Sequence, residues 1–404
     1  MKKFKIVSLG CRTNQYEAQA YADQLGSMGY VPSEGDADIC IVNSCTVTES
    51  ADSSSRHAIR QLKRDNPNAQ IVVTGCYAER KPNEVKDAGA SLVVPNGEKD
   101  KLLKMALPQE EEVPEFKINH FEAHTRAFVK VQDGCNSFCT YCIIPYVRGR
   151  SRSRKQEEIV REIEGLIANG FKEIVLTGIN IGDYDGGGGD NLANLVRVVD
   201  KIPGLKRLRL SSIDPDEVND DLMGAIIEGK NTCPSLHIVL QSGSNTILKR
   251  MNRKYTRQIF MQTIDKLRLA NPDFTFTTDI IVGFPGETEA DFQDTISIMN
   301  ETEFAKIHMF PYSKRPRTRA ALFTDHVESG IIKDRKNKVL RLSELNAFKL
   351  RQKYVGRTME VLVESESKGH THNFLEVVFA KPMISNEIVH AKLIDNSAEG
   401  LLTI

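Results

Sequence analysis

Apolar and polar positions change rhythm regularly along the first hundred residues. Short apolar runs rich in β-branched residues alternate with helical patterns such as 14–29, and the runs are 3–10, 37–43, 69–75 and 91–95. Strand-like runs separated by helical patterns are typical of a parallel sheet with crossover helices. Residues 1–106 are therefore predicted to form an α/β domain with a parallel sheet.

A second alternation begins after a short break in the pattern. Residues 107–120 contain two prolines and an acidic cluster, which indicate a linker. Helical patterns at 155–169, 256–270 and 288–300 then separate six strand-like runs, which are 127–133, 173–178, 207–212, 236–242, 274–283 and 305–312. This order predicts a partial (β/α)6 barrel over residues 121–355, with its chemistry at the carboxyl ends of the strands.

The last fifty residues have a different pattern. A long polar helical pattern covers roughly 331–355, and the segments 358–365, 373–380 and 387–394 then alternate like antiparallel strands. We predict a small antiparallel β-barrel over residues 356–404.

Composition and charge narrow the class of protein. The 404-residue chain has 54 Lys and Arg against 54 Asp and Glu, so any nucleic-acid contact has to use a local patch. No apolar run approaches the ~20 residues of a membrane helix, and the start of the chain does not resemble a signal peptide. We expect a cytoplasmic protein without a membrane partner, in which the eight cysteines stay reduced and serve metal binding or catalysis.

Three of these cysteines form the spacing C-x3-C-x2-C at Cys135, Cys139 and Cys142. Thiolates are the soft ligands of zinc and of iron–sulfur clusters. A structural zinc site needs four ligands, and the nearby candidates His120 and His124 lack zinc-like spacing. Three cysteines on a four-iron cluster leave one iron open for a substrate or cofactor. A structural metal site is the alternative.

Three more cysteines follow predicted strands of the N-terminal sheet. Cys11, Cys45 and Cys76 each lie just beyond an apolar run. The carboxyl ends of parallel strands share one sheet edge, so the thiols are expected to converge on a second cluster. Unrelated buried cysteines are the alternative. Cys40 lies inside its strand and is predicted to be a core thiol, while Cys233 is expected to be incidental.

These motifs resemble those of a known family. C-x3-C-x2-C with Tyr141 before the last cysteine is similar to the signature of radical S-adenosylmethionine enzymes. The whole chain resembles the radical methylthiotransferases, through "SLGCRTNQYEAQAYADQL", "VNSCTVT", "TGCYAER", "DGCNSFCTYCIIPYVRGRSRSR", "TDIIVGFPGET" and "MFPYSKRP". Residues 356–404 resemble the RNA-contacting TRAM module. One departure is Arg317, where the family usually has glycine.

The resemblance implies two [4Fe-4S] clusters and two uses of S-adenosylmethionine. One molecule donates a methyl group to sulfur associated with the cluster at Cys11, Cys45 and Cys76. Another, at Cys135, Cys139 and Cys142, yields the radical that removes a hydrogen from an unactivated C–H bond. Such a bond is too strong for acid–base catalysis, so a cofactor radical has to act on it.

Polar residues at predicted strand ends are candidates for holding S-adenosylmethionine. Besides Tyr141, they are Thr177 and Gly178, Ser211, Gln241 and Asp279. The carboxyl ends of barrel strands are where cofactors bind. Simple capping of the strand ends is the alternative.

A basic stretch follows the radical motif. In "VRGRSRSRK", the alternating arginines Arg148, Arg150, Arg152 and Arg154 would share one face of an extended chain. Such a face suits RNA phosphates. A solvated charge run or internal ion pairs are the alternatives. Lys314, Arg315, Arg317 and Arg319 form a second basic run.

The resemblance also suggests a substrate. The triplet "RTN" after Cys11 is similar to the group acting on N6-threonylcarbamoyladenosine beside the tRNA anticodon, at tRNA position 37, rather than to the groups with "QMN" or "PKN". The implied partners are the tRNA anticodon stem-loop and an electron donor such as flavodoxin or ferredoxin. Methylthiolation of isopentenyladenosine or of a ribosomal-protein aspartate, and a non-catalytic zinc-dependent RNA-binding role, are the alternatives.

Overall fold

The structure is a computed structural model that describes residues 1–121 and 124–403. Its N-terminal part is a parallel sheet with the strand order β2-β1-β3-β4-β5. The strands are β1 (Lys3–Ser8), β2 (Val31–Pro32), β3 (Ile39–Ser44), β4 (Gln70–Gly75) and β5 (Leu92–Val93). The parallel sheet predicted from the apolar runs is confirmed.

Helices cover both faces of this sheet, which is why its central strands are apolar throughout. Tyr21 and Leu25 of α1 pack with Leu102 and Leu103 on one face, and Ile59 of α2 packs on the other. The helices are α1 (Arg12–Ser27), α2 (Glu49–Asp65), α3 (Cys76–Arg80), α4 (Pro82–Asp87), the 3-10 helix η1 (Asn96–Lys101) and α5 (Leu102–Ala106).

The central part contains six parallel strands in two sheets, ordered β10-β9-β6 and β11-β12-β13. An isolated bridge between Ile213 and Ile238 joins the two sheets. The strands are β6 (Arg126–Lys130), β9 (Glu173–Thr177), β10 (Arg207–Leu210), β11 (Ser235–His237), β12 (Thr275–Val282) and β13 (Lys306–Pro311). They form the predicted partial barrel, with β11 ending earlier than its apolar run.

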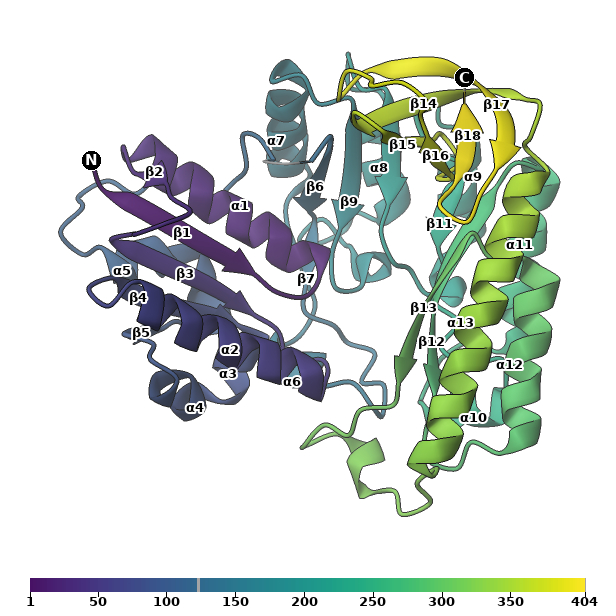
Figure 1. Ribbon diagram of the computed structural model, residues 1–404, viewed down its shortest axis with the longest axis horizontal. Coiled ribbons are helices and arrows are strands. Elements are labelled where there is room, and N and C mark those ends of the chain that lie inside the picture. The colour runs from purple at the N-terminus through teal and green to yellow at the C-terminus, as the bar shows by residue number, and fades with distance from the viewer. Residues whose placement is uncertain (122–123, 404) are drawn as a thin grey trace.

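The remaining elements of this part wrap the outside of the barrel or connect its strands (Figure 1). They are β7 (Gln132–Asp133), α6 (Ile144–Val147), β8 (Arg152–Ser153), α7 (Gln156–Ala168), η2 (Ile181–Asp183), α8 (Leu192–Asp200), η3 (Pro215–Glu217), α9 (Asp220–Glu228), α10 (Asn245–Arg250), α11 (Arg257–Ala270), α12 (Glu289–Thr302) and η4 (Arg319–Leu322).

The barrel is open along one side. Among the described residues β6 pairs only with β9, and β13 pairs only with β12. Helix α1 of the N-terminal part packs beside β6, with Tyr16 and Ala20 in the same core as Phe128 and Val129. The N-terminal part is therefore held against the barrel next to this opening (Figure 1).

The chain ends in a closed five-stranded barrel reached through the long helix α13 (Ser329–Gln352). Its strands are β14 (Thr358–Ser365), β15 (Lys368–Thr371), β16 (Glu376–Val378), β17 (Ile388–Asn396) and β18 (Leu401–Thr403). Neighbours are antiparallel except β16 and β18, which run parallel. The predicted small β-barrel is confirmed, with this one exception to its antiparallel pairing.

This small barrel covers the amino ends of the central strands. Arg207 of β10 is fully buried and donates to the Glu360 side chain at 3.2 Å and to the His370 carbonyl at 3.0 Å. Arg209 donates to the Thr371 carbonyl at 3.1 Å. With this end of the central barrel closed by protein, its chemistry belongs at the carboxyl ends of the strands.

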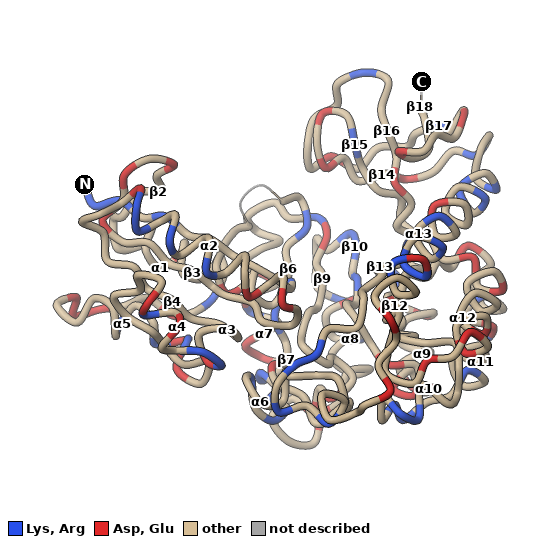
Figure 2. The backbone as a smooth tube through the Cα atoms, turned by 60° about the horizontal axis from the view of Figure 1, so that its bottom comes forward, with Lys and Arg blue, Asp and Glu red and all other residues tan. Residues whose placement is uncertain are grey.

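Charge and hydropathy carry no membrane signal. None of the helices in the described residues is long and apolar enough to span a bilayer. Figure 2 shows Lys and Arg interspersed with Asp and Glu along the backbone, in line with the equal numbers of the two signs.

Candidate active site between two cysteine triads

The register of the N-terminal sheet brings three cysteines to one edge. Ser44 pairs with Gly75, so Cys45 and Cys76 follow neighbouring strands at the same level. Cys11 follows β1 on the other side of β3. A Cβ on Gly10 would lie only 2.8 Å from Cys45 Sγ, so the backbone before Cys11 runs directly against that thiol. These residues are called the N-terminal triad below.

Local contacts fix the backbone of this triad. Ser55 of α2 accepts from the Cys45 amide at 3.2 Å and donates to the Cys45 carbonyl at 3.0 Å. Gly75 has a φ of +96°, and a Cβ there would lie 2.4 Å from the Ser44 carbonyl oxygen. Glycine is thus required before Cys76, because it permits both the left-handed backbone and the close approach.

The thiols of the N-terminal triad differ in their environments. Cys45 and Cys76 are buried, whereas Cys11 is exposed. Burial raises the pKa of Cys45 to about 12, and Cys76 and Cys11 add to the shift. Burial also raises the pKa of Cys76, but Arg148 opposes this shift and donates its Nε–H to Cys76 Sγ at 3.3 Å. A positive hydrogen-bond donor therefore faces a sulfur at this edge.

The second triad, Cys135, Cys139 and Cys142, lies on the loop between β7 and α6, called the radical loop below. Gln132 fixes the start of this loop, because its Nε2 donates to the Gly134 carbonyl at 2.8 Å. Gln132 Oε1 accepts from the amides of Ile179 and Asn180 at 3.0 Å, beyond the end of β9. The loop is therefore tied to the carboxyl end of the barrel.

The segment after α10 clamps the far side of the radical loop. Thr140 donates from its amide to the Met251 carbonyl at 3.0 Å and from Oγ1 to the Arg250 carbonyl at 2.8 Å. Arg253 Nη1 donates to Cys139 Sγ at 2.9 Å and also pairs with Asp214. Each triad thus has an arginine donating to one of its sulfurs.

The donor set fits iron–sulfur ligation. Within residues 1–121 and 124–403, no group of three or more His, Cys, Asp or Glu side chains is arranged to hold a single metal ion. Cysteines on a cluster bind separate irons, so they do not meet at one point. Burial raises the pKa of Cys142, and Cys139 and Cys135 raise it further, which places the three thiols near one another.

A cavity of about 210 Å³ lies between the two triads. The barrel contributes Cys142, Tyr141, Gln241 and Asp279 to its wall, and the N-terminal part contributes Val47 and Thr48, just after Cys45. Helix α6, which follows Cys142 directly, packs against Cys76 through Ile143 and Val147. Cys142 therefore borders the cavity directly, while the N-terminal triad reaches its wall through the residues after Cys45 and through the contact of Cys76 with Ile143.

The structure divides the six candidates for S-adenosylmethionine contacts into two groups. Tyr141, Gln241 and Asp279 line the cavity, whereas Thr177, Gly178 and Ser211 lie at the ends of β9 and β10 outside its wall. Gln241 Oε1, Tyr312 Oη and Ser211 Oγ are buried and have no hydrogen-bond partner in the described part of the chain. Buried polar atoms without partners are costly, so Gln241 and Tyr312, which line the cavity, fit a site completed by a polar ligand.

The predicted stripe of four arginines requires correction. Arg148 is fully buried and bonded to Asp133 and Glu17, and Arg154 pairs with Glu162 at 2.6 Å. Only Arg150 and Arg152 are exposed. The prediction assumed an extended chain, but Arg148 directly follows α6 and only Arg152 and Ser153 form a strand.

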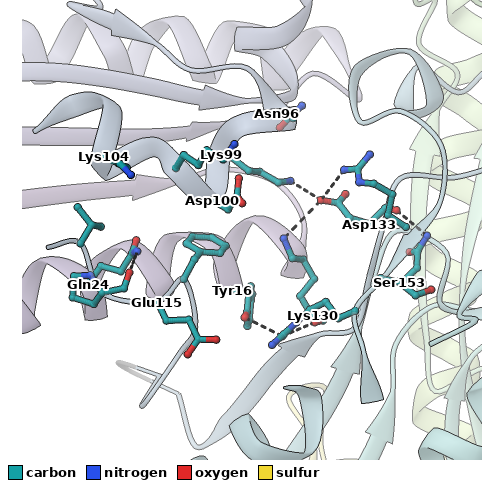
Figure 3. Close-up of a pocket in the computed structure, with 18 residues that line it drawn as sticks. Tyr16, Gln24, Asn96, Lys99, Asp100, Lys104, Glu115, Lys130, Asp133 and Ser153 are labelled. Atoms are coloured by element: carbon teal, nitrogen blue, oxygen red, sulfur yellow. Dashed lines mark hydrogen bonds and ion pairs between the residues drawn. The ribbon is translucent and has the colours of Figure 1, made fainter. Parts of the chain in front are cut away.

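The charges around Arg148 were not predicted as a group. Arg148, Lys99 and Lys130 surround Glu17 and Asp133, with Lys99 Nζ at 2.5 Å from Glu17 Oε1. Figure 3 shows Lys99 and Lys130 pointing toward Asp133 at the wall of a second cavity, of about 600 Å³, which no cysteine lines. The sequence contains only a weak indication of this charged group, because Lys130 and Asp133 interrupt an apolar run.

Three other single-residue predictions have clear outcomes. Cys40 is buried in the core of the N-terminal sheet, as predicted. Cys233, expected to be incidental, is buried beside Arg209 in the short segment before β11. Arg317 has a φ of +73°, a left-handed conformation that glycine adopts without strain, in line with the glycine that the resemblance led us to expect there.

The open side of the barrel holds polar residues that were not singled out. Arg12, the first residue of α1, lies over the Phe128 ring at 5.4 Å. Burial, together with the charges of Arg126 and Arg209, lowers its pKa to about 10. His237 Nε2 lies 3.4 Å from Asp279 Oδ1, and the His237 and His308 rings are 5.8 Å apart.

Two family profiles match this chain. Residues 129–299 match the radical SAM superfamily, and residues 3–94 match the uncharacterized protein family UPF0004. The first range includes the radical loop and most of the barrel, and the second includes the N-terminal triad.

Relatives match over nearly the full length. A threonylcarbamoyladenosine tRNA methylthiotransferase MtaB from Chlamydia pneumoniae is 49% identical, over 99% of this chain and 97% of its own. A tRNA-2-methylthio-N(6)-dimethylallyladenosine synthase from Clostridium novyi is 38% identical, over 91% of this chain and 86% of its own.

A solved structure supports the fold. The radical S-adenosylmethionine methyltransferase TsrM from Kitasatospora setae, solved with cobalamin and a [4Fe-4S] cluster, has a TM-score of 0.60 at 15% identity. The match covers 80% of this chain and 77% of that chain. At this identity the similarity concerns the fold alone, not the chemistry.

Proposed function

The chain belongs to the radical S-adenosylmethionine methylthiotransferases that act on tRNA, and on that premise we propose that it adds a methylthio group at C2 of N6-threonylcarbamoyladenosine. The observation that carries this proposal is the cavity lined by Cys142 on one side and by Val47 and Thr48, which follow Cys45, on the other. A reaction that joins a sulfur group to a radical carbon needs both components at one substrate atom.

An iron–sulfur cluster and S-adenosylmethionine are the cofactors of this family. We propose Cys135, Cys139 and Cys142 as the ligands of the cluster that binds S-adenosylmethionine. When bound, these groups supply the 5′-deoxyadenosyl radical that removes the C2 hydrogen. Tyr141, Gln241 and Asp279 are proposed to hold S-adenosylmethionine, because they line the cavity beside Cys142.

We also propose a second [4Fe-4S] cluster at Cys11, Cys45 and Cys76. Their position at one sheet edge, with Arg148 donating to Cys76, supports this assignment. Hydrogen bonds and positive charge around cluster sulfurs set reduction potential, so Arg148 and Arg253 are proposed to adjust the two clusters separately.

The protein's own contribution is to position the base and exclude water. Val47 and Thr48 close the cavity from the N-terminal part, and Ser313 Oγ accepts from the Glu49 amide at 3.3 Å across the gap. Contacts that bring the two parts together protect a reactive carbon from competing reactions.

The RNA contacts are assigned to exposed cations near the cavity. Arg150 and Arg152 remain candidates for phosphate contacts of the anticodon stem-loop, since both are exposed beside the radical loop. We infer that an electron donor such as flavodoxin or ferredoxin reduces the clusters, and that the enzyme works in the cytoplasm, where tRNA is modified.

The decisive test is a competition between substrates. Anaerobically reconstituted enzyme, S-adenosylmethionine and a reductant are incubated with tRNA carrying N6-threonylcarbamoyladenosine, with tRNA carrying isopentenyladenosine, and with the ribosomal protein. Mass spectrometry of the digested products should detect a gain of one methylthio group on the threonylcarbamoyl nucleoside alone.

Two outcomes would contradict the proposal in different ways. Product on isopentenyladenosine or the ribosomal protein alone would move the enzyme to another substrate group, which is a real competitor because a relative at 38% identity is named as a dimethylallyladenosine synthase. Product on none of them, from enzyme that still cleaves S-adenosylmethionine, would reject all three substrates.

A further inference from the structure

Arg12 differs from the buried arginines of this protein. Arg148, Arg207, Arg209, Arg315 and Arg335 each form an ion pair with a carboxylate, and Arg351 donates to Asn396 Oδ1 at 3.0 Å and to the Ser397 carbonyl at 2.9 Å. Arg12 is half-buried, yet its guanidinium forms no hydrogen bond or ion pair with any residue in 1–121 or 124–403. Its five N–H donors are therefore available to an anion that binds beside it.

The position of Arg12 places this charge at the opening of the barrel. Its guanidinium stacks over Phe128 on the edge strand β6. Its charge also reaches the other edge strand: burial lowers the pKa of His308 on β13, and Arg12 is among the neighbouring cations that add to the shift. Arg12 therefore lies beside the edge strand β6 on the open side of the barrel, directly after Cys11 of the N-terminal triad.

The nearby carboxylates are already engaged. Glu173 accepts from Arg209 at 2.7 Å and lies 4.0 Å from Arg126. Asp279 lies 3.4 Å from His237 Nε2 and belongs to the wall of the cavity between the triads. Arg126 and Arg209 add positive charge near Arg12. Arg126 pairs with Glu364 at 2.8 Å and Arg209 with Glu173, so Arg12 is the member of this group that has no carboxylate partner in the described residues, and a substrate anion would supply one.

We propose that Arg12 binds the carboxylate of the threonylcarbamoyl group and so selects this substrate. The inference rests on the proposed function. The threonylcarbamoyl group hangs on N6, and N1 alone separates C6 from C2 in the purine ring. A residue beside Cys11 that holds the carboxylate would thus orient C2 toward the space between the triads. The planar guanidinium suits a carboxylate because both can form two parallel hydrogen bonds.

The same residue would reject the competing substrate. An isopentenyl group has no acceptor, so its binding would leave the Arg12 guanidinium desolvated and unpaired. Sites built to hydrogen-bond a substrate group discriminate strongly against analogues that lack it. Arg12 is therefore expected to act through attraction of one substrate and rejection of the other.

Two anticodon stem-loops test this role. One carries N6-threonylcarbamoyladenosine, and the other carries its methyl ester, which lacks the negative charge. Reconstituted wild-type enzyme should bind the acid about 10- to 100-fold more tightly than the ester by fluorescence anisotropy, as expected for hydrogen bonds to a charged group. In Arg12→Gln this ratio should fall to about one, and Arg12→Lys should retain part of it.

The test compares the affinities for the acid and the ester as a ratio, because a change beside Cys11 could also damage the neighbouring cluster. Loss of iron caused by a change beside Cys11 would affect both stem-loops equally, whereas loss of the carboxylate contact changes only the acid. Arg161→Gln removes an exposed arginine of α7 and should leave the ratio unchanged. The kcat/KM values for the two stem-loops should follow the same pattern.

The result that overturns the inference is an acid-to-ester ratio in Arg12→Gln equal to that of the wild type, or a wild-type ratio near one. Either result can occur while wild-type enzyme still methylthiolates the threonylcarbamoyl stem-loop, in which case the proposed function stands. Absence of that product from wild-type enzyme would instead reject the proposed function.

Discussion

At the scale of single residues, the site depends on where charge is placed relative to sulfur. Arg148 contacts Cys76 through Nε and Asp133 through Nη1 at 2.8 Å, so one side chain joins the N-terminal triad to the strand that leads into the radical loop. Although burial opposes it, the charges of Lys99 and Arg148 hold the pKa of Glu17 below its usual range. Glu17 and Asp133, the two acids around Arg148, are therefore ionised, and the neighbouring cations compensate their negative charges.

Removing Arg148 should destabilise the fold. Arg148→Met would leave Glu17 and Asp133 buried with fewer compensating charges, and breaking a buried pair costs about 3–5 kcal/mol. Urea unfolding of the enzyme should show a lower midpoint. Arg150→Met removes an exposed guanidinium two residues away and should change stability by about 0.5 kcal/mol or less. Equal midpoints for the two variants would show that the buried network contributes little.

The cysteines and the arginines were predictable to different degrees. Cys45 and Cys76 follow apolar runs directly, so parallel pairing alone predicted that they would lie at one edge. The alternation of the arginines predicted one shared face, but the turn after α6 directs Arg148 inward. Arg12 entered only as part of the triplet "RTN", and its lack of a partner could not be predicted, because that depends on which acids other segments supply.

At the scale of elements, strand patterns were reliable where both faces are buried. Strand β12 is buried almost throughout and lies within the apolar run 274–283. The run 236–242 predicted a longer strand than β11, because apolar periodicity does not reveal that Gln241 has a φ of +64°. Strands β15 and β18 were missed, since short segments of a small barrel carry too few apolar positions to be recognised.

The contact between the central barrel and the small barrel should respond to acid. Burial lowers the pKa of His372 to about 4, and Arg207 and Arg209 lower it further, while Glu360 and Glu173 oppose them. Unfolded histidine titrates near 6.5. Between these values the unfolded state binds a proton that the folded state does not, so stability should fall as pH drops from 6.5 toward 4.

Thermal unfolding at pH 7, 5.5 and 4.5 checks this expectation. His372→Gln should lose less stability than the wild type over this range, because it removes the titrating group. His57→Gln changes an exposed position on α2 and should keep the wild-type pH dependence. If His372→Gln and the wild type lose stability in parallel, another group controls the acid response.

At the scale of the whole molecule, the contacts of the central barrel with the small barrel and with the N-terminal part place the reaction at the carboxyl ends of the barrel strands. The small barrel closes the amino ends of the central strands through Arg207 and Arg209. Helix α1 packs beside the open side of the barrel and brings Cys11 and Arg12 to it. Sequence patterns predicted each part but not their contacts, because packing between parts depends on single polar pairs rather than on periodicity.

The two triads come from different parts of the chain, so they should load iron separately. Reconstituted enzyme is expected to contain about eight irons, four for each triad. Replacing Cys135, Cys139 and Cys142 by alanine should halve the iron and abolish formation of 5′-deoxyadenosine. Replacing Cys11, Cys45 and Cys76 should also halve the iron but leave 5′-deoxyadenosine formation without tRNA, since the radical loop is clamped by Gln132 and by the segment after α10.

Cys40→Ala alters a buried thiol outside both triads and should keep all the iron. Full iron in the second triple variant would mean that the N-terminal triad holds no cluster, and the source of the transferred sulfur would then have to lie elsewhere.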